Sequence, residues 1–216
     1  MMRSSLIRIN LIFILIVLFI PNLLSAELKT FIKEYTYQAS EFDSKASGRA
    51  LALEQVKRLL LEELGIYLES NTEVKNYQLT KDQITTLTAG IVSAEVIDEK
   101  WDGKAYYLKA KLSADPKEVA QSINELRQDK EKTKELENIK KKSDEQVKEI
   151  ARLKKELEKD QAVSKKPSGK TDEKKVEQYT NAVTKLTAKD FLLKGLMLDS
   201  SKAAIDTYDK AIELDS

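Results

Sequence analysis

Hydrophobic and polar residues alternate along the first stretch after residue 26. Phe31, Lys33, Tyr35 and Tyr37 fall on one side, and mainly polar residues lie between them. A period of two predicts a β-strand, because successive side chains of a strand point to opposite faces. The mainly polar residues on the other side predict that this face of the strand is exposed to solvent.

A helical pattern follows, with apolar residues spaced by three or four positions. Asp43 and Ser44 are candidate N-caps, and Gly65 stands where a left-handed residue would end the helix. The apolar residues are Ala46, Ala50, Leu53, Val56, Leu60 and Leu64. Their spacing predicts one long amphipathic helix.

Beyond Gly65 the pattern is less regular. Residues 66–74 alternate and predict a second strand, although a helix that continues to Glu69 fits nearly as well. Thr80 is placed to cap a short helix over residues 81–88, and Gly90 is placed to end it.

A β-hairpin is predicted next. Residues 91–100 and 104–112 form two strand-like runs around Trp101, Asp102 and Gly103. Asp-Gly at such a position favours a type I′ turn, which requires two positive φ angles. The predicted order is therefore β-α-β-α-β-β, an α+β domain over residues 27–113 in which one long helix covers three or four strands.

Part of this domain resembles a known family. The resemblance is carried by an alanine-spaced helix that ends in Gly, at Ser47–Ser70 (SGRALALEQVKRLLLEELGIYLES), and by a second Gly before a strand pair, at Thr80–Val92 (TKDQITTLTAGIV). These stretches are similar to the small N-terminal domain of the flagellar assembly protein T group and related exported bacterial proteins. The resemblance implies an extracytoplasmic binding or scaffold module and brings no catalytic residues.

A highly charged segment occupies residues 114–160. Asp115 and Pro116 are typical of a helix start, and residues 117–160 contain 13 basic and 12 acidic side chains without an aromatic residue, Gly or Pro. The apolar positions with heptad-like spacing are Val119, Ile123, Leu126, Ile139, Ile150, Leu153 and Leu157. The segment predicts one long helix that either pairs as a coiled coil with a second copy or acts as a solvated spacer. Thirteen residues separate Leu126 from Ile139, so the register slips midway.

Residues 161–175 are polar, contain Pro167 and Gly169, and predict a linker. The C-terminal segment, residues 176–216, then begins with a helical face, formed by Val176, Tyr179, Val183 and Leu186.

Two further stretches, Phe191–Leu198 and Ala203–Ser216, resemble the two helices of one tetratricopeptide repeat. The matching positions are Phe191, Gly195, Leu198, Ala204, Tyr208 and Ala211. The stretches depart from the repeat pattern at three points. These are Lys194 at a position usually occupied by Leu, the short spacing from Gly195 to Ala204, and Ser216 in place of Pro. An ordinary amphipathic helical hairpin is the alternative.

One such repeat buries only part of its apolar face. We therefore expect that the sequence is the front part of a longer repeat protein. The alternatives are that the hairpin packs on the helix over residues 176–186 or on another subunit.

The first 26 residues predict an export signal. A short basic start is followed by ten consecutive apolar residues, 11–20, and by a small-residue site that ends at Ala26. We expect cleavage after Ala26 and a periplasmic location. The alternative is an uncleaved membrane anchor, which would be the chain's contact with the membrane.

Composition narrows the possible chemistry of the 216 residues. The chain has neither His nor Cys, which excludes catalysis by Ser-His or Cys-His pairs, thiol redox chemistry, and the usual zinc, haem and iron-sulfur ligands. Without Arg3 and Arg8 of the signal segment, 35 basic and 36 acidic residues remain, and this balance gives no basic excess for nucleic acid.

Three motif searches give no site. Gly169-Lys170-Thr171 lacks the preceding Gly and strand of a phosphate-binding loop. Asp98, Asp102 and Gly103 lack the ligands of a calcium loop, and Glu62 and Glu63 are adjacent on a helix and point apart. We name no catalytic, cofactor-binding or metal-binding residue, and expect no cofactor and no enzyme activity.

These features together predict a non-catalytic exported scaffold or adaptor in the bacterial cell envelope, with protein partners and a possible homo-oligomer formed through the long helix. The alternative is a module that binds a polyanion or a cell-wall glycan. It would use the Lys-rich linker or the aromatic residues of the sheet, such as Trp101.

Overall fold

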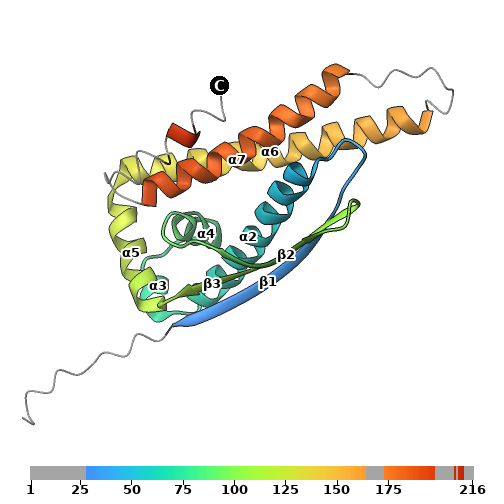
Figure 1. The fold of residues 1–216 in the computed structure, drawn as a ribbon. Coiled ribbons are helices and arrows are strands. Elements are labelled where there is room, and N and C mark those ends of the chain that lie inside the picture. Colours follow the sequence, from blue (N-terminus) through green and yellow to red (C-terminus); the bar gives the residue numbers. More distant parts are fainter. Residues whose placement is uncertain (1–27, 164–172, 198–206, 208, 212–216) are drawn as a thin grey trace, which may run out of the picture.

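The structure is a computed structural model that describes residues 28–163, 173–197, 207 and 209–211. In this part of the chain the sheet has three antiparallel strands in the order β1-β3-β2 (Figure 1). They are β1 (Lys29–Gln38), β2 (Glu95–Trp101) and β3 (Ala105–Ala114). The α+β class, the first strand and the hairpin are confirmed.

Helix α2 (Lys45–Glu69) covers one face of this sheet, over β1 and β3. Ser44 caps it as predicted, since its side chain accepts a hydrogen bond from Ser47 N. One stripe of α2 faces the sheet and is fully buried; it includes Ala52, Val56, Leu60, Leu64 and Leu68. This stripe forms the main core together with the inward side chains of β3.

Two predictions around Gly65 are wrong. Gly65 lies inside α2 and is buried, and the predicted strand over residues 66–74 is the end of α2 followed by the short helix α3 (Thr72–Asn76). A Cβ at Gly65 would lie 3.0 Å from Thr85 Oγ1 of a neighbouring helix. Gly65 therefore permits close packing of two helices rather than a turn, and the alternative of a helix running to Glu69 is confirmed.

The neighbouring helix is α4 (Lys81–Ala89), which begins and ends as predicted. Thr80 and Gln83 form a reciprocal capping box, and Gly90 is the C-cap. Gly90 has a negative φ, so its role is spatial: a Cβ there would lie 2.7 Å from Leu136 Cδ1. Its missing side chain lets the next helical unit approach α4.

The hairpin turn differs from the predicted type. Gly103 has a φ of +91°, but Asp102 is not among the described residues with a positive φ, and type I′ requires two. Asp102 instead accepts hydrogen bonds through Oδ1 from the backbone nitrogens of Lys104 and Ala105. The Asp side chain therefore closes the turn, and only Gly103 supplies the unusual backbone angle.

The predicted single long helix is two helices, α5 (Pro116–Gln128) and α6 (Lys130–Val163). Asp115 caps α5, with Pro116 in the first turn, as predicted. The chain bends at Asp129, whose backbone is extended and whose side chain accepts a hydrogen bond from Lys132 N. Asp129 lies between Leu126 and Ile139, where the heptad-like spacing of the sequence slips. The slip in the sequence therefore marks the place of the break.

Helix α7 (Glu173–Met197) packs along α6, and the two form an intrachain helical hairpin (Figure 1). Its core contains Ile150, Leu153 and Leu157 of α6 with Tyr179, Val183 and Leu186 of α7. The apolar positions that predicted a coiled coil with a second copy are thus buried within one chain. Helix α6 is therefore not a solvated spacer. The helical face over residues 176–186 is confirmed.

The predicted boundaries also shift. Helix α6 continues to Val163 and α7 starts at Glu173, so the linker is shorter than residues 161–175. Phe191–Met197 continues the same α7 without a helix boundary. Residues 1–26, Gly169 to Thr171 and most of Ala203–Ser216 lie outside the described residues. None of the helices in the described ranges is long and apolar enough to span a membrane.

In Figure 1 the α6/α7 hairpin lies across α2, on the side away from the sheet. We call the sheet with α2, α3 and α4 the head. Phe42, Ala50 and Leu51 of the head pack against the core of the hairpin, while Leu136 of α6 joins the core of the head. The head and the hairpin therefore share buried surfaces on both sides of their junction.

Candidate functional site

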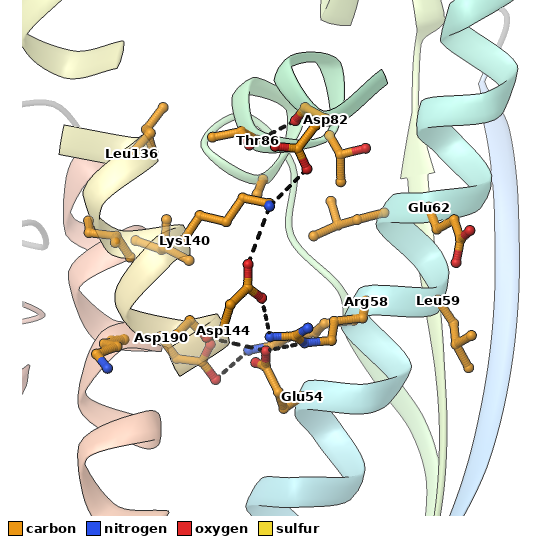
Figure 2. A pocket seen from close by; sticks show the side chains of 18 of the residues that line it. Glu54, Arg58, Leu59, Glu62, Asp82, Thr86, Leu136, Lys140, Asp144 and Asp190 are labelled. Carbon is orange, nitrogen blue, oxygen red and sulfur yellow. Dashed lines mark hydrogen bonds and ion pairs between the residues drawn. The ribbon is translucent and has the colours of Figure 1, made fainter. Parts of the chain in front are cut away.

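A cleft of about 690 Å³ lies where the hairpin crosses the head. It is enclosed by α2 and α4 of the head and by α6 and α7 of the hairpin (Figure 2). Apolar side chains contribute part of the lining, namely Leu59, Leu61, Ala89, Leu136, Ile139 and Leu193. Residues from four helices thus form one concave surface that no single segment of the sequence indicates.

Ion pairs cross this cleft from helix to helix. Arg58 of α2 contacts Glu54 Oε1 at 2.8 Å within its own helix and Asp144 Oδ1 of α6 at 2.7 Å. Lys140 of α6 lies 3.3 Å from Asp144 and 2.9 Å from Asp82 of α4. We call this chain of contacts, from Glu54 through Arg58, Asp144 and Lys140 to Asp82, the charge ladder; Figure 2 shows its members pointing toward one another.

A separate ion pair joins the other side of the cleft. Lys57 of α2 donates a hydrogen bond to Asp190 of α7, and both side chains are only about a fifth exposed, at 22% each. Partly exposed pairs contribute about 0.2–1 kcal/mol each. The pairs therefore set the orientation of the hairpin, while the apolar contacts supply most of its stability.

The two cations of the ladder, Lys140 and Arg58, have raised pKa values. The hydrogen bond with Asp82 raises the pKa of Lys140. Burial acts to lower the pKa of Arg58, but hydrogen bonds and ion pairs with Glu54 and Asp144 outweigh burial and raise it. Both bases are therefore held protonated and engaged, which suits them to positioning helices and not to proton transfer.

A buried polar cluster holds the far end of the hairpin on the head. The side chain of Asp43 is fully buried and accepts hydrogen bonds from Tyr37 and Tyr179 and from the backbone and side chain of Ser40. Lys154 of α6 completes it: Nζ lies 2.7 Å from Tyr37 Oη, 2.8 Å from the Gln38 carbonyl and 4.2 Å from the centre of the Tyr37 ring. We call these residues the Asp43 cluster.

The pKa values within the cluster are shifted in opposite directions. Burial acts to raise the pKa of Asp43, but hydrogen bonds from Tyr179 and Ser40 stabilise the carboxylate and lower it overall. Burial raises the pKa of Tyr179, and so does its hydrogen bond to Asp43. Burial likewise raises the pKa of Tyr37. The cluster is thus one carboxylate bound by two neutral phenols, an arrangement that connects β1, α6 and α7.

A second groove, of about 480 Å³, runs between α2 and α7 beside the Asp43 cluster. Its walls carry Phe42, Ala46, Ala50 and Leu53 of the head and Val183 of α7. Three threonines of α7 line it as well, and each bonds a carbonyl of its own helix. Their hydroxyl groups are therefore already engaged within α7. Sequence reasoning missed both hollows because each needs helices that are far apart in the chain.

Of the acidic residues that the sequence analysis considered as candidate sites, only Glu62 lies at the cleft. Glu62 lines it and pairs with Lys81 at 3.6 Å, whereas Glu63 pairs with Lys33 on the other side of α2. Asp98 and Asp102 are in β2 and the hairpin turn. Within the described residues, no group of three possible metal ligands is found.

The aromatic residues of the sheet divide between core and surface. The Trp101 ring lies 5.9 Å from that of Tyr106, and Gly48 of α2 leaves room for both. Tyr107 points to the open face and donates a hydrogen bond to Glu34 at 2.9 Å. Trp101 therefore belongs to the packed side of the sheet, and Tyr107 is the aromatic residue on the open face of β3.

Comparison with known proteins gives no relative: no protein-family model, no curated protein and no solved structure matches the chain.

Proposed function

We propose that this protein is a non-catalytic scaffold or adaptor exported to the bacterial cell envelope, where it binds another protein in the cleft between head and hairpin. The observation that carries the proposal is the cleft itself, a concave surface with apolar patches and paired charges of both signs. Such a surface suits a helix or peptide that buries apolar side chains and offers polar groups at its edges.

The sequence supports the location. The segment over residues 1–26 has the basic start, apolar run and small-residue end of an export signal, which favours a periplasmic protein with cleavage after Ala26. The likeness of the head to the flagellar assembly protein T group agrees with an extracytoplasmic role. A three-stranded sheet covered by a long helix is compatible with that likeness but is a common arrangement.

The C-terminal segment supports an adaptor role in a further way. Phe191–Met197 is helical within α7, and Thr207 and Asp209–Ala211 are helical as well, with Ala211 buried. This is compatible with a hairpin like that of a tetratricopeptide repeat, a unit that forms protein-binding surfaces in stacks. We include the repeat-like hairpin in the proposal as a second contact surface.

The experiment is site-specific photo-crosslinking in cells that export the protein. A photoreactive residue is introduced at Gln55, which lines the cleft, and as the matched control at Tyr107 on the open sheet face. The proposal predicts a discrete protein adduct from position 55 and not from position 107. Adducts at equal yield from both positions, or none from position 55, would contradict it.

The repeat-like hairpin is tested by shortening the chain after Met197. A cut after Lys175 would remove Tyr179 and Leu186 and so destroy the core between α6 and α7. Such a cut would therefore not separate a loss of binding from a loss of folding. The cut after Met197 leaves α7 complete. Loss of the adduct with an unchanged urea midpoint is the expected result if residues beyond 197 contribute to binding.

A further inference from the structure

Exposed apolar side chains gather along one edge of the sheet. In the described part of the chain, six large hydrophobic residues are exposed, and five of them lie on β1, directly before it, or at the end of α2. These five are Leu28, Ile32, Tyr35, Ile66 and Tyr67. Tyr67 is tied to β1, since its ring packs edge-on against Phe31 at 6.0 Å. Such a concentration of apolar surface marks an interaction site.

The two edges of the sheet differ in how open they are. Strand β2 has seven residues and a register shift between Val96 and Asp98, and such a bulge hinders the addition of another strand. Strand β1 has ten residues in unbroken register with β3. Its other edge makes no backbone hydrogen bonds of the ladder type with any described residue. The long, regular edge is therefore the one that can accept a further strand.

The charges of β1 are already engaged within the chain. Lys33 pairs with Glu63 of α2 at 3.2 Å. Glu34 accepts a hydrogen bond from Tyr107 and lies 3.7 Å from Lys109, both on β3. The edge therefore offers a partner backbone groups flanked by apolar side chains. The partner strand must bring apolar side chains to this patch and must not bring like charges opposite Lys33 or Glu34.

A second copy of β1 meets these conditions in one register. We propose that two copies of this chain pair antiparallel through β1 about a two-fold axis at Ile32, which forms a continuous six-stranded sheet. In this register Ile32 faces Ile32 of the second copy, Phe31 faces Lys33, Thr30 faces Glu34, and Lys29 faces Tyr35. No like charges stand opposite each other, and the patch is self-complementary, as a two-fold interface requires.

Other registers fit less well. A two-fold axis at Lys33 or at Glu34 places identical charges opposite each other. An axis at Tyr35 leaves Leu28 beyond the paired residues, because its partner position lies past the end of β1 at Gln38. Of the axes at Ile32, Lys33, Glu34 and Tyr35, the axis at Ile32 is the one that pairs Leu28, Ile32 and Tyr35 in one ladder without placing identical charges opposite each other.

The same register also covers the exposed end of α2. The axis is perpendicular to the sheet, so α2 of both copies lies on one face. Tyr67 contacts Phe31 and lies under Lys29 Nζ at 6.0 Å, and these strand residues face Lys33 and Tyr35 of the second copy. The exposed Tyr67 of one copy is therefore brought to the exposed Tyr35 of the other. This inference is independent of the proposed partner in the cleft.

The test combines sedimentation equilibrium of the purified chain with single-cysteine crosslinking. Ile32→Glu places two carboxylates at the axis, and we expect dimerisation to weaken at least about tenfold. Ile97→Glu is the matched control, because Ile97 is the sixth exposed apolar residue and lies on the opposite edge. It should leave the dimer intact, and both variants should keep the urea midpoint that the unmodified chain has at concentrations where it is monomeric.

Crosslinking tests the register. The chain contains no Cys, so Ile32→Cys introduces the only thiol. Directly opposed residues of an antiparallel pair are close enough for a disulfide, so Ile32→Cys should oxidise to a covalent dimer, whereas Tyr35→Cys and Ile97→Cys should not. A monomer at high micromolar concentration, equal dissociation by Ile97→Glu, or crosslinking through Tyr35→Cys in place of Ile32→Cys would overturn the proposal.

Discussion

Asp43 joins parts of the chain that are far apart in sequence, since it binds Tyr37 of β1 and Tyr179 of α7 in a site closed by Lys154 of α6. A buried carboxylate without partners would destabilise the fold by several kcal/mol. The carboxylate and its donors therefore depend on one another, and the hairpin can dock only in the orientation that completes their hydrogen bonds. The cleft depends on that same docked orientation.

Stability should fall at both ends of the pH range. The pKa of Asp43 lies below its ordinary value of 3.8 in the folded chain, so its contribution is complete above that value and is lost as the pH falls further. The pKa values of Tyr37 and Tyr179 are raised above 10.0, so the folded state retains neutral phenols and stability is lost as the pH rises through and beyond 10. Urea midpoints measured across this range should show a plateau between the two losses.

Two substitutions separate these effects. Asp43→Asn should lower the free energy of unfolding at neutral pH by about 2–4 kcal/mol, because buried donors lose a charged acceptor. It should also reduce the loss of stability that the unmodified chain shows as the pH falls. Asp98→Asn, at a more exposed carboxylate of β2, should change little. An acid loss that is the same in Asp43→Asn as in the unmodified chain would contradict the assignment.

Gly65 offers a second test at the scale of single residues. In a helix interior Ala is favoured over Gly by about 1 kcal/mol, yet a Cβ at Gly65 would crowd Thr85 Oγ1. We expect Gly65→Ala to destabilise the chain by about 1 kcal/mol, and the same change in a Thr85→Ala background to stabilise it by about 0.5–1 kcal/mol. The measurement is the free energy of unfolding of four chains: the unmodified chain, the two single variants and the double variant. If Gly65→Ala changed this free energy with the same sign in both backgrounds, the packing role of Gly65 would be refuted.

At the scale of elements, local patterns predict most of the helices and strands, whereas their partners come from the tertiary fold. The caps at Ser44, Thr80 and Asp115 act within one turn of chain and were predictable. Gly65 misled because a glycine that makes room for a distant helix has the same sequence signature as one that ends a helix. The break at Asp129 was visible only as a slip in register.

The same limit applies to the apolar face of α6. Its heptad-like spacing shows that it packs on a helix, but not that the helix is α7 of the same chain. The cleft was beyond prediction for this reason, because its walls come from α2, α4, α6 and α7. Net charge and the lack of His and Cys could restrict its chemistry in advance without locating it.

The intrachain pairing of α6 and α7 predicts the cost of a core substitution. Leu157 is only 1% exposed in the hairpin core, so Leu157→Ala should lower the free energy of unfolding by about 2–5 kcal/mol at any protein concentration. Lys155→Ala, at an exposed position two residues earlier, should change it by less than about 0.5 kcal/mol. A loss that depends on protein concentration would instead assign Leu157 to a contact between copies.

At the scale of the whole molecule, a head and a helical hairpin share buried contacts and are oriented by the Asp43 cluster at one end and by the charge ladder at the other. The cleft lies at the ladder, and the open edge of β1 lies on the far layer of the fold. An adaptor that dimerises through β1 would therefore present two clefts without blocking either of them.

Filling the cleft tests whether it is the binding surface. Ala89 lines the cleft and is partly exposed, so Ala89→Trp adds volume there without removing a member of the charge ladder. The measurement is the yield of the protein adduct from the photoreactive residue at position 55, in chains with Ala or Trp at position 89 and equal urea midpoints. We expect Trp to reduce the yield at least about tenfold; an unchanged yield would show that the partner does not occupy the cleft.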